Sequence, residues 1–377
     1  MTAASAGAVC SLDSDDPGRG RASQEPTVTT PMTTPRSAGY RMPPEWAPHA
    51  GCWMAWPCRP ENWDDLERAR ATYVEVARAV ARFEPVTMTA NAEDAGAARS
   101  ALAGIAAARV VVVPSDDSWS RDTAPTFVVD GRGSLAGVDW RFNAYGGIYE
   151  EYGRTRDMAQ RILDLIGARR FAAPLTLEGG AIHVDGDGTV LTTSEVVLDP
   201  RRNPHLDRPA AERLLCDYLG ADKVIWLSSA LDHDNTGGHV DNLACFAAPG
   251  VVAALGCDDR DDPQYAAVQE NLGRLRAATD ACGRALEVVE LPMPERPEFH
   301  GRRISPSYVN FFIANGGVVM PTFGDPADAR ARDLLAHLFP RAAVVQVPTL
   351  ELAKADGNIH CITQQQPDAG RRPTVRA

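Results

Sequence analysis

No run in the sequence reaches the roughly 20 consecutive apolar residues that a membrane-spanning helix needs, which excludes a helical membrane protein. The N-terminus also lacks the apolar core of a signal peptide, because Asp13, Asp15 and Asp16 occupy that region. The eight cysteines have neither the close pairs of a metal site nor the compact spacing of a disulfide framework. We therefore expect a cytoplasmic protein with reduced thiols.

Positive charge is scarce as well. The net charge is −12 and the isoelectric point is near 5.2, so a nucleic acid would meet a repulsive field. Nucleic acid is thus not an expected partner, whereas a small cation is electrostatically acceptable. The hydrophobic content of 44% over 377 residues excludes a chain disordered throughout and suffices for one large core or two small ones.

Three segments differ in composition. Residues 1–39 are rich in Ser, Thr, Pro, Gly and Ala, and their few large apolar side chains cannot offset the entropy lost on ordering. This segment is predicted to be a disordered tail, and residues 367–377 a second, shorter one. Residues 40–366 form the predicted domain.

Within that domain, short apolar runs typical of strands alternate with amphipathic stretches typical of helices, which predicts an α/β fold. Their even spacing indicates a repeated unit, and the Asp-Gly-Asp-Gly turn at residues 185–188 indicates directly paired strands rather than a simple doubly wound sheet. Strands are expected at residues 109–113, 125–129, 189–193, 223–227, 251–255, 285–291, 309–313, 317–321 and 343–347. Helices are expected at residues 63–83, 154–166, 207–219, 264–282 and 326–338.

Polar and small residues gather in five candidate site loops, at residues 116–123, 143–147, 178–183, 236–242 and 357–366. The last loop contains Cys361, whose thiolate would be a nucleophile. A buried structural cysteine is the competing interpretation, but the flanking glycine and polar run are atypical of a core strand. His360 would face away from Cys361 if the segment is a strand, so it is not expected to be the proton partner.

His239 is the expected proton partner. If residues 237–242 are extended, His239 and Asp241 point to the same face and bring an imidazole and a carboxylate into one site. A metal site is the rival hypothesis, but no second His or Cys stands at ligand spacing. Glu178 adds another carboxylate, followed by two glycines that permit close approach of backbone or ligand.

Residues 116–123 pack three carboxylates, an arginine and Trp119 between two predicted strands. A solvated turn is one interpretation, but a large aromatic amid charges usually covers something, and its face attracts a flat cation. A guanidinium is such a cation, with five N–H donors in a fixed fork that paired carboxylates such as Asp122 and Asp241 can hold bidentately. Its charge would favour the thiolate of Cys361, and His239 would protonate the departing ammonia and then activate water.

The chain resembles the agmatine deiminase branch of the guanidine-modifying (pentein) superfamily. The matching segments cover nearly all of residues 40–366, which the resemblance identifies as a deiminase catalytic domain. In chain order they are Met42-Pro43-Pro44-Glu45-Trp46 and residues 53–57, 117–127, 142–147, 177–193, 238–246, 307–325 and 357–365.

The resemblance implies a five-bladed α/β propeller with pseudo-fivefold symmetry and a site on its axis. It implies hydrolysis of agmatine to N-carbamoylputrescine and ammonia through a covalent thiouronium intermediate, a step of putrescine and polyamine biosynthesis, with no metal and no organic cofactor. The expected partner is a small cationic guanidino substrate, and assembly into a homo-oligomer is left open. The implied catalytic residues are Cys361, His239, Glu178, Asp122 and Asp241, with Trp119, Asp122, Asp241, Gly357 and Asn358 at the substrate.

Four positions depart from the family pattern. Ser120, Ala124, Tyr145 and Asp356 stand where methionine, glycine, tryptophan and glycine are usual. They flank the catalytic positions and bear on the tail of the substrate, where Asp356 would favour a cationic group if it faces the pocket. The alternatives are another guanidino substrate (arginine, peptidyl-arginine or a natural-product intermediate), an amidinotransferase and a catalytically silent binding protein.

Overall fold

The computed structural model describes residues 33–228, 231, 234–295, 298–304 and 306–370, all within the compact unit Thr33–Ala377. Residues 1–32 of the predicted N-terminal tail and residues 371–377 of the C-terminal one lie outside this set. Both tail boundaries need correction. The 3-10 turn η1 (Arg36–Ala38) is folded and an ion pair of 2.6 Å joins Arg36 to Asp222, while Pro367 pairs with His49 in a sheet.

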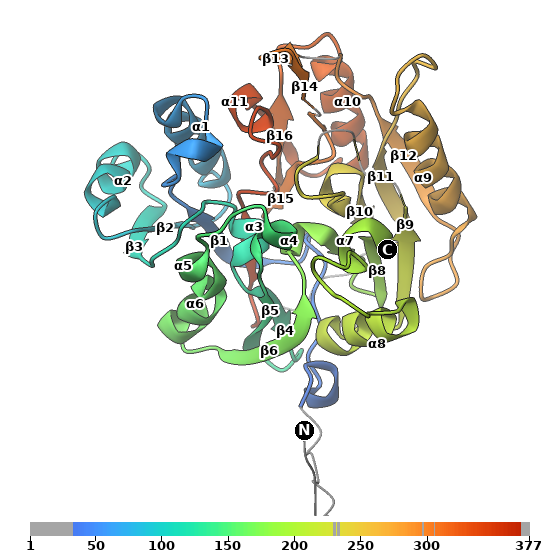
Figure 1. Ribbon diagram of the computed structural model, residues 1–377, viewed down its shortest axis with the longest axis horizontal. Helices are drawn as coiled ribbons and strands as arrows, with labels where there is room; N and C mark the ends of the chain where they lie inside the picture. Colours follow the sequence, from blue (N-terminus) through green and yellow to red (C-terminus); the bar gives the residue numbers. More distant parts are fainter. Residues whose placement is uncertain (1–32, 229–230, 232–233, 296–297, 305, 371–377) are drawn as a thin grey trace, which may run out of the picture. The chain divides into compact units, whose positions relative to one another are not determined.

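The fold is mixed α/β, as predicted. Four sheets of the described residues share one pattern, in which the first strand is antiparallel to the second and the second is parallel to the third. They are β4 (Thr126–Val129), β5 (Leu135–Arg141) and β6 (Arg169–Thr176); β7 (Ile182–Val184), β8 (Thr189–Thr193) and β9 (Lys223–Leu227); β10 (Ala244–Ala248), β11 (Val251–Leu255) and β12 (Glu287–Leu291); β15 (Phe312–Ala314), β16 (Gly317–Thr322) and β17 (Ala343–Pro348) (Figure 1).

A fifth sheet repeats the pattern with strands from both ends of the described chain. β18 (Gln364–Pro367) pairs antiparallel with β1 (His49–Ala55), which is parallel to β2 (Val86–Ala90), and β3 (Ala108–Val112) adds a second parallel pair. The strand that follows Cys361 is therefore fixed to the strand that follows residues 42–46. A two-stranded ribbon, β13 (Glu298–Phe299) and β14 (Arg302–Arg303), lies outside this repeat.

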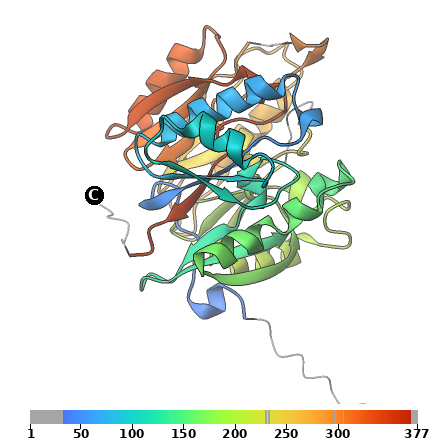
Figure 2. The same ribbon diagram turned by 90° about the vertical axis from the view of Figure 1, so that its left-hand side faces the viewer.

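Parallel neighbours need crossover connections, and helices supply them. They lie outside the strands in Figure 1, and Figure 2 shows α1 and α2 side by side. The crossover helices are α1 (Leu66–Val80), α2 (Ala95–Leu102), α6 (Met158–Ile166), α8 (Arg208–Leu219), α9 (Tyr265–Ala277) and α10 (Asp328–Leu338). The short helices and 3-10 turns are α3 (Ser120–Thr123), α4 (Ala144–Gly147), α5 (Gly153–Arg156), α7 (Ser194–Val197), α11 (Leu350–Ala353), η2 (Pro60–Asn62), η3 (Gly179–Ala181) and η4 (Val240–Asn242).

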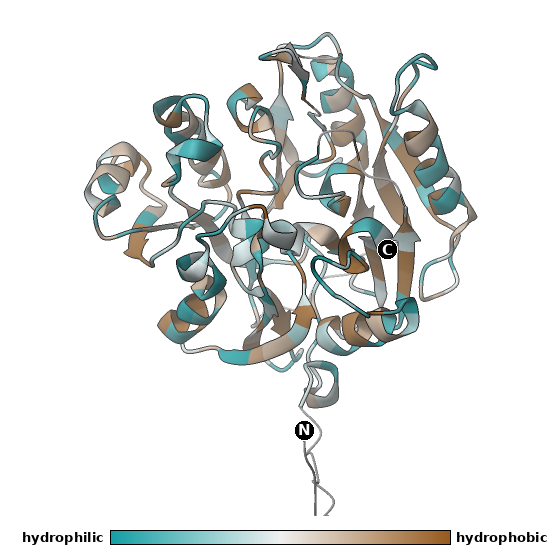
Figure 3. Ribbon diagram, viewed as in Figure 1, coloured by the Kyte–Doolittle hydropathy of each residue, from teal (hydrophilic) through white to brown (hydrophobic). Residues whose placement is uncertain are grey.

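Local sequence explains where these helices begin and end. The Asp65 side chain caps α1 by accepting from two backbone N–H groups, and Asp207 caps α8 in the same way through one. Gly220 ends α8 in the left-handed conformation with a φ of 67°. In Figure 3 the strands β11 and β12 are largely apolar, whereas α9 and α10 mix polar and apolar residues, as surface helices do. Of the helices described, none combines the length and the apolar character needed to cross a membrane.

Most predicted elements are confirmed, with three corrections. The helix expected at 154–166 is divided into α5 and α6 around Asp157, and the helix expected at 264–282 ends at Ala277. The strand expected from residue 309 begins only at Phe312, and the side chain of Asn310 before it accepts from the backbone N–H groups of His360 and Cys361. The turn at 185–188 joins β7 to β8 as predicted.

Candidate active site

Four of the five predicted site loops line one pocket. The fifth loop, at residues 178–183, lies directly behind it and supplies the buried Glu178 and Gly180. The pocket is lined by Trp119, Asp122, Tyr145, Ile148, Tyr149, Asn235, Thr236, Ala355, Asp356, Gly357 and Cys361.

Cys361 lies in the turn before β18, and its side chain is buried. The Asn310 Nδ2 donates to the Cys361 Sγ at 3.1 Å, and the thiol donates to the Asp241 Oδ2 at 3.5 Å. Burial raises the pKa of the Cys361 thiol well above its ordinary value, and Asp241 and Asp122 raise it further. Additional positive charge beside the sulfur would therefore favour the thiolate.

His239 is fully buried between two carboxylates. Its Nε2 lies 3.3 Å from the Glu178 Oε2, and its Nδ1 lies 3.6 Å from the Asp122 Oδ1, too far for a hydrogen bond. Burial alone would lower the pKa of His239, but Asp122, Glu178 and Asp241 outweigh it and raise the pKa to about 9. The imidazole is thus a cation near neutral pH, with one N–H directed at no hydrogen-bond acceptor among the described residues.

The extended segment expected at residues 237–242 is wrong in its local form. Residues 240–242 form the 3-10 turn η4, and Gly237 and Gly238 before it have φ values of 80° and 116°. His239 and Asp241 nevertheless both reach the site. A Cβ built on Gly180 would lie 2.6 Å from the His239 Nδ1 and 3.0 Å from the Asp241 Oδ2. Only glycine fits at residue 180, where these groups converge.

Asp122 is held by two donors. The Gly180 N–H donates to its Oδ1 at 2.9 Å, and the Tyr145 hydroxyl donates to its Oδ2 at 3.1 Å. Burial raises the pKa of Asp122 to about 6 despite the opposing effect of His239. Tyr145 has a φ of 57°, as does Ala144, a conformation that costs energy for residues other than glycine and that clusters at functional sites. The strained segment is therefore part of the carboxylate's support.

Glu178 is buried and contacts a second cation besides His239, the guanidinium of Arg202. Arg202 Nε donates to both Glu178 oxygens, at 2.9 and 3.0 Å, and both side chains are fully buried. Burial would raise the pKa of Glu178, but His239 and Arg202 lower it below its ordinary value. The carboxylate is thus ionised and fixed beside the His239 Nε2.

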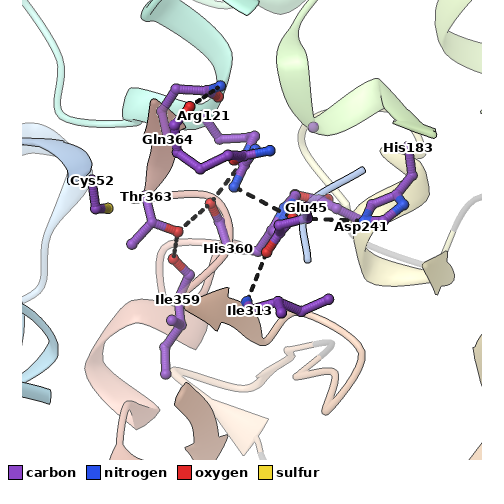
Figure 4. A network of polar contacts seen from close by, with 12 residues as sticks. Glu45, Cys52, Arg121, His183, Asp241, Ile313, Ile359, His360, Thr363 and Gln364 are labelled. Atoms are coloured by element: carbon purple, nitrogen blue, oxygen red, sulfur yellow. Dashed lines mark hydrogen bonds and ion pairs between the residues drawn. The ribbon is translucent and has the colours of Figure 1, made fainter. Parts of the chain in front are cut away.

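Asp241 belongs to a second buried network (Figure 4). Its Oδ2 lies 2.8 Å from the His360 Nδ1, and the His360 Nε2 lies 2.9 Å from the Glu45 Oε2. His360 lowers the pKa of Asp241 against the effect of burial. The other oxygen, Asp241 Oδ1, is buried and has no hydrogen-bond partner within the described part of the chain. One oxygen is therefore fixed by His360, and the other is a buried acceptor that no described residue engages.

Three residues have the donor types of a metal site. The ligand atoms of Glu45, His183 and His360 lie within 4.8 Å of one another. These atoms already face one another and neighbouring charges, because His360 Nε2 faces Glu45, His360 Nδ1 faces Asp241, and the Arg121 guanidinium lies 3.8 Å from Glu45. The cluster is therefore an ion-pair network in which a metal ion would compete with two cations already in place.

The predicted substrate-contacting residues divide into two groups. Trp119 and Gly357 line the pocket and touch, since a Cβ on Gly357 would lie 2.3 Å from the Trp119 Cζ3. Asn358 does not line the pocket; it is buried, and its side-chain oxygen accepts from the backbone N–H of Ile359 at 3.0 Å. Of the three carboxylates predicted at 116–123, only Asp122 lines the pocket.

Two loop residues that line the pocket bind each other. The Asn235 side-chain amide donates a hydrogen bond to the Asp356 carboxylate. Asp356 has a φ of 61°, which explains why glycine would also suit this position. Tyr149 lines the pocket as well, so an aromatic ring and a carboxylate stand together along its wall.

Several site residues had no role in the sequence-based prediction. Glu45 lies in a matching motif but has no predicted role, the strand predicted around His360 turns its side chain away from Cys361, and Asn310 and Arg202 carry no local signal. The Met-Pro-Pro-Glu-Trp motif at 42–46 was the available clue for Glu45. Contacts between residues more than 50 apart in the chain, such as Asn310 with Cys361, follow only from the fold.

Comparison with known proteins places this geometry in context. The family described as Porphyromonas-type peptidyl-arginine deiminase matches residues 41–367. The chain is 47% identical to an agmatine deiminase of Stutzerimonas stutzeri over 90% of its length and 99% of the relative's, and 46% identical to one of Pseudomonas aeruginosa with the same coverage. A solved agmatine deiminase of Enterococcus faecalis superposes with a TM-score of 0.86 at 38% identity, covering 89% of this chain and 98% of the other.

Proposed function

The chain belongs to the Porphyromonas-type peptidyl-arginine deiminase family, and on that premise we propose that it hydrolyses agmatine to N-carbamoylputrescine and ammonia. The observation that carries the proposal is the convergence of a buried cysteine, a protonated histidine and ionisable carboxylates on one pocket. Such a set repels an oxyanion and attracts a cation. The 47% identity to an agmatine deiminase over 90% of the chain favours agmatine among guanidino compounds.

Electrostatic attraction between the guanidinium and two buried carboxylates drives substrate binding. The guanidinium lies between Asp122 and Asp241, whose buried Oδ1 supplies an acceptor without another hydrogen-bond partner in the described residues. Its planar fork of donors suits two carboxylates from opposite walls. The arriving cation offsets the two anions that raise the pKa of Cys361, so the thiol loses its proton to solvent and the thiolate faces the guanidinium carbon.

The first chemical step forms the S–C bond. The thiolate of Cys361 attacks the guanidinium carbon, and His239, which is protonated at neutral pH, donates a proton to the departing nitrogen. The C–N bond breaks, ammonia leaves, and a thiouronium remains on the sulfur. Glu178 stabilises the imidazolium beforehand and fixes the ring through Nε2, which leaves Nδ1 for the transfer.

The second step uses the same histidine in reverse. The neutral His239 takes a proton from water, the hydroxide attacks the thiouronium carbon, and the C–S bond breaks. The hydroxyl proton of the tetrahedral intermediate passes to the leaving sulfur, so the products are a neutral ureido group and the Cys361 thiol, with His239 again protonated. The loss of the substrate's charge weakens its attraction to Asp122 and Asp241, which assists product release.

The tail of agmatine fits the wall of the pocket. Trp119 and Tyr149 present apolar faces to a short methylene chain, and Asp356 supplies an anion for a terminal ammonium. A free arginine would bring its carboxylate toward the same anion. Asp356 therefore favours an amine-terminated substrate.

We further infer the propeller fold, the pathway and the cellular compartment of the enzyme. The common strand order of five sheets, with β18 completing the sheet of β1, supports a five-bladed propeller. The product is a precursor of putrescine, which supports a role in polyamine biosynthesis. The seven described cysteines are free thiols, and this supports a cytoplasmic enzyme, because that compartment keeps thiols reduced.

A substrate panel tests the proposal. The purified protein is incubated separately with agmatine, arginine and an arginine-containing peptide, and ammonia and ureido products are measured. We expect kcat/KM to be highest for agmatine by at least about tenfold, with one ammonia for each N-carbamoylputrescine. Preference for arginine or the peptide would overturn the substrate assignment. Formation of a guanidino product from an added amine, with little ammonia, would identify an amidinotransferase instead.

A further inference from the structure

We propose that His360 is a positioning residue: an imidazolium clamped between Glu45 and Asp241 that holds Asp241 in place to receive a guanidinium beside Cys361. The inference rests on the proposed function, because the role assigned to Asp241 is guanidinium binding. His360 does not line the pocket that contains Cys361; it lines a separate small cavity together with Glu45 and His183. It acts through Asp241.

The bonding of the ring fixes its protonation. His360 Nδ1 lies 2.8 Å from the Asp241 Oδ2, and Nε2 lies 2.9 Å from the Glu45 Oε2. A neutral imidazole has one N–H and one lone pair, so one carboxylate would face that lone pair at hydrogen-bond distance and be repelled. An imidazolium donates to both. The three side chains are 4%, 1% and 3% exposed, so water does not replace either bond.

The surrounding charges support the same state. Phe246 N–H donates to the His183 Nδ1 at 3.2 Å, so the proton of a neutral His183 lies on Nε2, which is directed at the Glu45 Oε2 3.6 Å away. The two anions Glu45 and Asp241 then balance the two cations Arg121 and His360. A buried network of this kind is tolerated when its charges are paired. The titratable and charged groups that face or adjoin His360 are Asp241, Glu45, Arg121, His183 and Cys361.

The direction of the pKa shifts agrees with the geometry. Burial and then Arg121 lower the pKa of His360, but Glu45 and Asp241 outweigh them and raise it above its ordinary value. The pKa of Glu45 is well below its usual range, because His360 and its other partners overcome the effect of burial. Each partner therefore stabilises the charged form of the other.

Hydrogen bonds to other segments hold Glu45 and His360 in place. Glu45 Oε1 accepts from the backbone N–H of Ile313 at 2.8 Å, which ties the network to β15 (Figure 4), and the His360 N–H donates to the Asn310 Oδ1 at 2.9 Å. At the other end, Asp241 Oδ2 accepts from His360, and Oδ1 is buried without a hydrogen-bond partner among the described residues. Loss of the clamp would let Asp241 rotate or take up a proton, and a misplacement of about 1 Å in such a group can cost about 100-fold in rate.

Nuclear magnetic resonance of the full-length protein, labelled with 15N at the histidine rings, tests the protonation directly. The His360 signals are assigned by their loss in His360→Gln. We expect both ring nitrogens to show imidazolium shifts at neutral pH, and the ring in Glu45→Gln to titrate at least about one pH unit lower, since one stabilising anion is gone. A neutral ring at neutral pH, or an unchanged titration in Glu45→Gln, would overturn the inference even if agmatine is turned over normally.

Kinetics with agmatine test the positioning role, with His183→Gln as the matched control because His183 contacts Glu45 but not Asp241. We expect His360→Gln to lower kcat/KM about 100-fold with contributions from both KM and kcat, and His183→Gln to change it only a few-fold. Equal losses in both variants, or near-normal kinetics in His360→Gln, would contradict the role. If His360→Gln does not fold, the titration in Glu45→Gln decides. A wild-type protein with a protonated His360 but no agmatine turnover would refute the proposed function alone.

Discussion

His239 and His360 are two buried histidines with similar neighbours and different bonding. Each ring lies between two carboxylates, and the pKa of each is raised. His360 has both nitrogens within 2.9 Å of an acceptor, whereas the nitrogens of His239 lie 3.3 and 3.6 Å from theirs. Charge alone therefore does not distinguish the two rings. They differ because both nitrogens of His360 have a close acceptor, whereas those of His239 do not.

The difference indicates how one site can use imidazolium in two ways. A ring whose two N–H groups are satisfied by carboxylates has little reason to release a proton, and it serves as a fixed cation. A ring with one long bond and one N–H that lacks an acceptor in the described structure can transfer its proton to a bound substrate. We therefore assign proton transfer to His239 and positioning to His360.

The largest expected effect lies at the nucleophile, which neither histidine can replace. Cys361→Ala should reduce agmatine turnover to background, because no S–C bond can form. Cys245→Ala is the matched control, a buried cysteine in β10 that does not line the pocket, and it should retain turnover if the protein folds. Ammonia release measures both variants. Substantial turnover by Cys361→Ala would show that catalysis is not covalent at Cys361. The roles assigned to His239 and His360 would then lose their basis.

The next effect separates the rings themselves. His239→Gln removes the proton donor while leaving Asp122 and Asp241 in place, so we expect turnover to fall about 10²- to 10⁴-fold. Agmatine should still bind, which calorimetry can measure. A smaller loss in His239→Gln than in His360→Gln would reverse the two assignments.

The pH dependence of turnover also distinguishes the two histidines, because of the two rings only that of His239 transfers a proton. Its acid form is present below a pKa of about 9, so kcat at saturating agmatine, where the bound cation has already favoured the Cys361 thiolate, should fall as pH rises through about 9. Asp122 must be ionised to attract the cation, and since burial raises its pKa to about 6, kcat/KM should fall as pH drops through about 6. Initial rates at saturating and at low agmatine measure the two limbs separately. Activity that still rises steadily above pH 9 would contradict the role of His239 as acid.

The smallest effect is expected at Asp356, which lines the pocket wall away from both rings. Asp356→Asn keeps a residue that tolerates its positive φ and removes only the charge. We expect KM for agmatine to rise about two- to fivefold, and discrimination against arginine to weaken, because an exposed ion pair contributes little. Parallel kinetics with the two substrates measure the change. An unaltered preference would show that the tail is recognised elsewhere.

Much of the site was predictable because its chemistry is carried by short motifs. Cys361, His239, Asp122, Asp241 and Glu178 were all expected, and all lie in or directly behind one pocket. Agmatine deiminase resemblance was confirmed by relatives at 47% identity. The roles of the individual residues stay predictions that the variants above would test.

Other features depend on tertiary contacts that a linear pattern does not contain. The role of His360 was missed because the segment was treated as a strand; it is a turn, so alternation of side chains does not apply. Strands β1, β2, β5, β6, β7, β10, β13, β14 and β18 were not predicted as strands. In β5 and β10 the cause is their small residues Ala and Gly, which give weak periodicity. The networks around Glu45 and Arg202 join residues from segments far apart in the sequence and emerge only on folding.

Trapping the covalent intermediate tests the central claim most directly. Turnover of agmatine is quenched in acid within the first catalytic cycles, and the protein is analysed by intact mass and by peptide mapping, with Cys361→Ala as the control. We predict an adduct with the mass of the amidino-substrate fragment on Cys361 that decays as N-carbamoylputrescine forms. Product formation with no adduct on Cys361 under any quench time, or an adduct on another residue that decays at the turnover rate, would contradict the account.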